Sequence, residues 1–164
     1  MAAHVLVVAT VTATSEDLLA ALRERARRSS VPIRFLLVMP ASGPATATME
    51  TRLAEALERW EEIGLKAEGV IGDADPVQAV AEVCKPGTFD EVIVSTLPGQ
   101  TSRWLRSDVP YRIGALTDLP VTHVVAMSMV KNLPEPSQPQ QHRREPLSLL
   151  NVMAYRSSRR PAEH

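Results

Sequence analysis

The stretch HVLVVAT (residues 4–10) is a short, uninterrupted run of apolar and β-branched residues. Such a run is typical of a strand that is covered on both faces, as the strands of parallel sheets are. The stretch TSED (residues 14–17) resembles a capping box, in which we expect the Thr14 hydroxyl to accept a hydrogen bond from a free amide of the first helical turn. From Leu18 to Ala26, apolar residues then recur at helical spacing. The chain is therefore predicted to open with a buried strand, a turn and an amphipathic helix.

Strand-like and helix-like segments keep alternating along the sequence. Further strands are predicted at residues 33–39, 66–71, 91–95 and 121–127. Gly64 is placed to end the second helix, and Asp75 with Pro76 is a strong start signal for the third, with Asp as the cap and Pro in the first turn. Five strands alternating with four helices predict an α/β fold, a Rossmann-like parallel sheet with right-handed crossovers and helices on both faces.

Apolar spacing also predicts which side chains the later helices turn toward the sheet. These side chains are Val77, Val80, Ala81 and Cys84 in the third helix, and Tyr111, Ile113, Leu116 and Leu119 in the helix before the fifth strand. Trp104 precedes that last helix, and we expect it to pack in the core, with a stacking face for a ligand as the alternative.

Composition divides the 164 residues into two parts. We expect residues 1–130 to form the α/β domain and residues 131–164, which are rich in Pro, Ser and Gln, to form an irregular C-terminal extension. Six basic and three acidic side chains give the extension a charge of +3, which leaves −4 for the domain out of a total of −1. This balance gives no electrostatic reason to expect nucleic acid or a membrane as a partner.

Cysteine content and the amino-terminal sequence bear on the compartment. Cys84 is the single cysteine, so the chain cannot form an intramolecular disulfide. The first residues carry no basic region of the kind that begins a signal peptide, and no run approaches the roughly 20 apolar residues of a membrane span. We therefore expect a cytoplasmic protein.

In an open doubly wound sheet, ligands bind outside the carboxyl ends of the strands, where the strand order reverses. For this chain, the turns at that place are residues 9–15 and 95–108. The first turn is small and hydroxylic and contains no carboxylate, which excludes a phosphate-accepting receiver domain, because such a domain holds Mg²⁺ with acidic residues there. A glycine-rich dinucleotide turn and a Walker loop are also absent from the sequence.

The second turn, STLPGQTSRWLRSD (residues 95–108), combines a glycine, several hydroxyls and two arginines just before a helix. Backbone amides, a helix N-terminus and arginine side chains are the groups that bind anions. The candidate ligand-binding residues are Thr10, Thr12, Val38, Ser95, Thr96, Gly99, Thr101, Ser102, Arg103 and Arg106. We predict no catalytic residue and no metal site, because His4, His142 and His164 lie near the chain ends, His123 is a lone histidine in a core strand, and no Cys/His/Asp cluster has metal-ligand spacing.

Over roughly residues 5–126 the chain resembles a universal stress protein. The most specific segments are GDADPVQAV (residues 72–80), FDEVIVS (residues 89–95) and the Pro120-Val121 pair that opens the last strand. The resemblance implies the strand order 3-2-1-4-5 and homodimers that pair through the fifth strand. It also implies ATP or another adenine nucleotide as the ligand, since many members of the family bind ATP.

The nucleotide-binding motif of that family, G-x2-G-x9-G-S/T, is altered in this chain. Placed from the end of the fourth strand, its glycines fall on Ser95, Pro98 and Asp108. The aspartate that follows the first strand in the family falls near Val11 and Thr12 and is also missing. Side chains at glycine positions fill the space where backbone approaches phosphate, and proline removes an amide donor. We therefore expect a modified or silent version of the site, with Arg103 supplying charge.

These observations favour a non-enzymatic stress-response or regulatory module that binds a nucleotide or another phosphorylated small molecule weakly or in an altered pose. One alternative is an interaction or dimerisation module that has lost nucleotide binding and acts through its dimer surface and the extension, which holds an apolar segment at residues 147–152. A nucleotide hydrolase is the third reading, with Asp108 as the nearby candidate acid.

Overall fold

The computed structural model describes residues 1–41, 46–99 and 102–131. The chain divides into two units, Met1–Asn132 and Leu133–His164. The description below therefore concerns the first unit, and the extension predicted at residues 131–164 lies outside the described residues apart from Lys131.

The first unit contains one five-stranded sheet whose order is β3-β2-β1-β4-β5. The strands are β1 (Ala3–Val8), β2 (Ile33–Pro40), β3 (Lys66–Gly72), β4 (Glu91–Thr96) and β5 (Val121–Val125). The helices are η1 (Val11–Thr14, a 3-10 turn), α1 (Glu16–Arg28), α2 (Thr46–Glu62), α3 (Pro76–Val83), α4 (Arg103–Arg106), α5 (Val109–Thr117) and α6 (Ser128–Lys131). All four strand pairs are parallel, with Val5 of the central strand opposite Phe35 on one side and Glu91 on the other. The predicted fold and strand order are confirmed.

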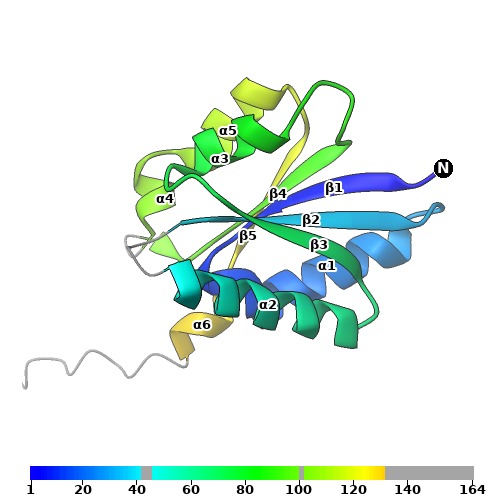
Figure 1. Cartoon of the computed structure of the whole chain (residues 1–164), viewed down its shortest axis with the longest axis horizontal. Helices are drawn as coiled ribbons and strands as arrows, with labels where there is room; N and C mark the ends of the chain where they lie inside the picture. Colours follow the sequence, from blue (N-terminus) through cyan, green and yellow to red (C-terminus); the bar gives the residue numbers. More distant parts are fainter. Residues whose placement is uncertain (42–45, 100–101, 132–164) are drawn as a thin grey trace, which may run out of the picture. The chain divides into compact units, whose positions relative to one another are not determined.

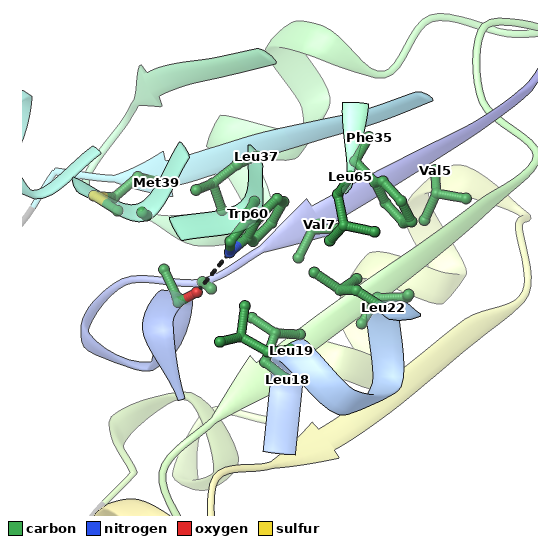
Figure 2. Packing of buried hydrophobic residues seen from close by; sticks show 14 of the residues in the cluster. Val5, Val7, Leu18, Leu19, Leu22, Phe35, Leu37, Met39, Trp60 and Leu65 are labelled. Atoms are coloured by element: carbon green, nitrogen blue, oxygen red, sulfur yellow. Dashed lines mark hydrogen bonds between the residues drawn. The ribbon is translucent and has the colours of Figure 1, made fainter. Parts of the chain in front are cut away.

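Helices cover both faces of this sheet, with α1 and α2 on one side and α3 and α5 on the other (Figure 1). Under α1 and α2, the core is built around Leu18, Leu22 and the fully buried Trp60 (Figure 2). Under α3 and α5, Val80 and Ile113 pack against the other face. Burial on both faces explains why the central strands are continuous apolar runs rather than alternating ones.

The start of α1 differs from the prediction. Ser15, not Thr14, caps the helix, and its hydroxyl accepts a hydrogen bond from the Leu18 amide at 3.2 Å. The reason is that Val11–Thr14 forms η1, which moves the first free amides of α1 one residue further along the chain. The other two signals are confirmed: Asp75 Oδ1 accepts from the Val77 amide at 2.9 Å, and Gly64 has a φ of +87° after α2.

The buried faces of α3 and α5 agree with the prediction in part. In α3, Val77, Val80 and Cys84 pack against the core as predicted, whereas Ala81 is exposed and Ala79 is buried instead. Ala79 packs directly on Gly72, where a Cβ atom would lie only 2.7 Å from the Ala79 Cβ.

In α5, Val109 and Ile113 face the sheet, while Tyr111 is 73% exposed and Leu116 is 51% exposed. This helix packs on β5, which is the edge of the sheet, so its outer side extends past the last strand. No helix in the described part of the chain is long and apolar enough to cross a bilayer.

Candidate functional site

A cavity of about 690 Å³ opens at the carboxyl ends of β1 and β4, where the strand order changes direction. This is the place where doubly wound sheets bind ligands. The described residues that line it are Thr10, Val11 and Thr12 after β1; Pro40 and Ala41 after β2; Ala74, Asp75 and Pro76 after β3; Ser95, Thr96 and Leu97 after β4; and Ser102, Arg103, Trp104, Ser107, Val109 and Arg112 around α4 and α5. Its size lies within the range of small-molecule pockets. We refer to this cavity as the crevice.

The turn after β1 is held in place from both sides. Thr12 is buried, and its hydroxyl donates a hydrogen bond to the Ser95 carbonyl at 3.4 Å, which joins this turn to the end of β4. On its other side, the Trp60 indole N–H donates to the Ala13 carbonyl at 2.8 Å (Figure 2). The two turns that border the crevice are thus fixed to each other and to α2.

Ser95 is 1% exposed, and its hydroxyl has no hydrogen-bond partner among the described residues. The residue lies at the carboxyl end of β4 and lines the crevice. A buried hydroxyl without a partner costs about 1 to 3 kcal/mol, and such groups are rare away from functional sites. A polar ligand atom in the crevice would satisfy it.

The neighbouring hydroxyl, that of Thr96, already has a partner. Its Oγ1 lies 2.7 Å from Nε2 of His123 on β5, and Thr96 also lines the crevice. His123 is exposed on its outer side, and partial burial lowers the pKa of its imidazole below the usual value. The hydrogen bond between the two side chains joins β5 to Thr96 at the edge of the crevice.

The segment after β4 brings cationic side chains to the crevice. Ser102 caps α4, with its hydroxyl accepting a hydrogen bond from the Leu105 amide at 3.3 Å, and Arg103 begins that short helix. All three arginines of this region are exposed, but Arg103 lines the crevice, whereas Arg106, three residues further on, is not among the lining residues. Arg112 of α5 adds a second cation to the lining.

Two residues of this segment adopt the left-handed backbone conformation. Gly99 has a φ of +57°, and Asp108, at the start of α5, has the same φ of +57° although it is not glycine. Asp108 stands where the last glycine of the nucleotide motif is expected. The backbone conformation of Asp108 is therefore one that favours glycine, and its side chain makes no capping hydrogen bond.

The structure brings together six of the ten candidate residues: Thr10, Thr12, Ser95, Thr96, Ser102 and Arg103. Val38 lies instead in the core beneath α3, where it would meet a Cβ atom at position 72 at 3.4 Å. Gly99 and Arg106 are not among the lining residues, and Thr101 lies outside the described residues.

Sequence reasoning missed Asp75 and Arg112 as lining residues. A signal for Asp75 was present, since it follows β3 directly and the carboxyl ends of parallel strands meet at one edge. Trp104 is half-buried and packs against the core beneath α3 and α5, as predicted. It also lines the crevice, and its role as a stacking face stays a prediction. Across the described ranges, no group of three or more His, Cys, Asp or Glu side chains could hold a metal ion.

Solved structures of other proteins resemble this chain in fold, and two of them are as follows. One is a universal stress protein from Archaeoglobus fulgidus that is 15% identical to this chain. The match covers 76% of this chain and 98% of that protein, with a TM-score of 0.53. The other is a universal stress protein family protein from Arabidopsis thaliana with AMP bound, 17% identical, which covers 82% of this chain and 97% of its own with a TM-score of 0.54. No protein-family model matches the sequence, and no curated protein matches it either. At these identities the likeness shows the fold, and the resemblance seen in the sequence is confirmed at that level.

Proposed function

On a universal stress protein fold, we propose that this chain is a non-enzymatic, cytoplasmic regulatory module that binds a phosphorylated small molecule in the crevice. An adenine nucleotide is the leading candidate ligand. The observation that carries the proposal is the buried Ser95 hydroxyl, which has no partner among the described residues and lines the same cavity as Arg103 and Arg112.

The charge distribution supports an anionic ligand. Arginine side chains form short, charge-assisted hydrogen bonds with phosphate, and two of them, Arg103 and Arg112, line the crevice. The part of the chain before residue 131 carries a net charge of −4, so these two cations stand against an overall negative background. The hydroxyls of Thr10, Ser102 and Ser107 line the same cavity and add hydrogen-bonding groups. The Arabidopsis protein, which shares the fold, binds AMP.

A role without catalysis is proposed because His123 and Asp108 do not line the crevice, and the carboxylate that does, that of Asp75, is fixed as the cap of α3. The imidazole of His123 is hydrogen bonded to Thr96, and the Asp75 carboxylate caps α3. Asp108, the candidate acid of a hydrolase, is exposed and is not among the lining residues. A general acid or base needs to reach the reacting atoms, and neither His123 nor Asp108 lines the cavity.

The proposal is tested by isothermal titration calorimetry of the full chain with ATP, ADP, AMP and cyclic AMP. We expect saturable binding of at least one of them, and a loss of about tenfold or more in affinity for Arg103→Ala, since a charge-assisted hydrogen bond contributes about 1.5 to 3 kcal/mol. Arg106→Ala is the matched control, because this arginine belongs to the same helix and does not line the crevice. Absence of binding at millimolar ligand, or equal affinity for wild type and Arg103→Ala, would overturn the proposal.

A second function, homodimerisation through β5, is favoured by a separate observation. Tyr111 and Leu116 are large, apolar and exposed on α5, beside the edge strand β5. A second copy pairing along β5 would cover this surface. Light scattering across a range of concentrations tests it: a dimer that dissociates in Tyr111→Asp supports the interface, and a monomeric wild type at all concentrations contradicts it.

A further inference from the structure

We propose that Asp75 makes the crevice selective for phosphate esters that carry a vicinal diol, such as a ribose phosphate, over phosphate groups alone. This inference rests on the proposed function, because it concerns the second half of the ligand that Arg103 and Arg112 would hold. Asp75 lines the same cavity as these arginines, but it follows β3, the edge strand at the other end of the strand order from β4 and β5.

The spacing of the strands separates the two charges. Asp75 follows β3, and Arg103 follows β4, which stands three places away in the order β3-β2-β1-β4-β5. Adjacent strands are about 4.8 Å apart, so the strand ends that carry these residues are about 14 Å apart. A bare phosphate cannot contact both walls, whereas a phosphate attached to a sugar can, given the reach of an arginine side chain. The cavity volume of about 690 Å³ leaves room for such a ligand.

The chemistry of the Asp75 carboxylate suits hydroxyl groups. Its Oδ1 accepts a hydrogen bond from the Val77 amide at 2.9 Å, and its backbone amide donates to Asp73 Oδ1 at 2.9 Å, which fixes the residue at the start of α3. The other oxygen, Oδ2, has no donor within the described part of the chain and remains available to accept. Carboxylates at strand ends bind ribose hydroxyls in dinucleotide-binding folds, and they repel a bare anion.

An independent observation favours a polar ligand in this cavity. Ser95 lies at the carboxyl end of β4 and lines the same cavity as Asp75, Arg103 and Arg112, and its buried hydroxyl has no partner among the described residues. Asp75 alone would be an ordinary helix cap. The Ser95 hydroxyl, which has no partner among the described residues, belongs to a residue that lines the same cavity. With it, Asp75 becomes one end of a binding site whose other end is formed by Arg103 and Arg112.

The test uses Asp75→Asn, because asparagine caps a helix about as well as aspartate while removing the charge. Three probes are titrated into the full chain: AMP, 2′,3′-dideoxy-AMP and inorganic phosphate. We expect wild type to bind AMP about tenfold more tightly than the dideoxy compound, which lacks the diol. In Asp75→Asn, the affinity for AMP should fall about tenfold, while that for phosphate stays equal or rises, because a repulsive charge has been removed. Thermal unfolding of the variant checks that the cap is retained.

The outcomes separate this inference from the proposed function. If AMP binds and Arg103→Ala weakens it, but Asp75→Asn binds AMP as tightly as wild type or more tightly, the role of Asp75 is overturned and the proposed function stands. If wild type binds AMP and its dideoxy analogue with equal affinity, the role of Asp75 is likewise overturned and the proposed function stands. If AMP does not bind at millimolar concentration, both are overturned.

Discussion

The indole N–H of Trp60, a fully buried residue of α2, donates a hydrogen bond to the carbonyl of Ala13 in η1 at 2.8 Å (Figure 2). Forty-seven residues separate the two in sequence. This bond ties the turn that carries Thr10 and Thr12 to a helix that packs on the same face of the sheet as α1. The geometry of the crevice therefore depends on a core residue that does not line it.

Trp60→Phe should destabilise the protein more than its small change in volume suggests. The substitution leaves the Ala13 carbonyl buried without its donor, which costs about 1 to 3 kcal/mol in addition to the lost packing. Urea unfolding followed by circular dichroism measures the change. Trp104→Phe is the control, because Trp104 is half-buried and should lose less stability. A smaller loss for Trp60→Phe than for Trp104→Phe would contradict the assigned role of the bond.

Two glycine substitutions should act in opposite directions. A Cβ atom at Gly72 would lie 2.7 Å from the Ala79 Cβ, so Gly72→Ala forces β3 and α3 apart and should cost about 1 to 3 kcal/mol of stability. At Gly114 inside α5, the nearest atom to an added Cβ is Val121 Cγ2 at 3.4 Å, and alanine favours a helix by up to about 1 kcal/mol. Gly114→Ala should therefore raise the melting temperature while Gly72→Ala lowers it. If both substitutions shifted the melting temperature in the same direction, the effect predicted from the packing of α3 on β3 would be contradicted.

The left-handed conformation of Asp108 predicts that glycine is preferred there. Asp108→Gly and Asp108→Ala both remove a carboxylate that makes no capping hydrogen bond, so the comparison isolates the backbone. The glycine variant should be more stable than the alanine variant by about 1 kcal/mol, since φ of +57° strains any residue with a Cβ. Thermal unfolding of the pair measures this difference, and equal stabilities would mean that the segment relaxes to another conformation.

His123 should make stability fall in mild acid. Partial burial lowers the pKa of its imidazole in the folded state, so below the unfolded value of about 6.5 the unfolded chain binds more protons than the folded one. Stability is then lost as pH decreases from about 6.5 toward the folded pKa. NMR titration should give a midpoint for His123 below 6.5. In His123→Gln, the glutamine amide can still form a hydrogen bond with Thr96, and the loss of stability between pH 7.5 and 5.5 should be smaller than in wild type. If the loss is unchanged, the acid sensitivity arises from a group other than His123.

The fold could be predicted from the sequence because local and global signals agree. The continuous apolar runs indicated strands buried on both faces, and Asp75-Pro76 and Gly64 marked helix ends that the structure confirms. The burial of Ala79 in place of Ala81 could not be predicted in this way, because it depends on the contact between Ala79 and Gly72, two residues on different elements.

The candidate site could be predicted as a place but not as a full set of residues. Strand ends and the hydroxyl-rich turns indicated Thr12, Ser95 and Arg103, since topology alone brings the ends of β1 and β4 together. Arg112 lies a turn inside α5, and its direction depends on how that helix packs against α3 and β5. The unsatisfied state of the Ser95 hydroxyl is likewise a property of its surroundings and leaves no trace in the sequence.

A crystal structure of the full chain grown with millimolar AMP tests the central claim most directly. The account predicts ligand density between the turns that contain Thr10 and Ser95, with the phosphate against Arg103 and Arg112 and a polar atom within hydrogen-bond distance of the Ser95 hydroxyl. An empty crevice in crystals that contain the ligand, or AMP bound away from both arginines, would contradict it.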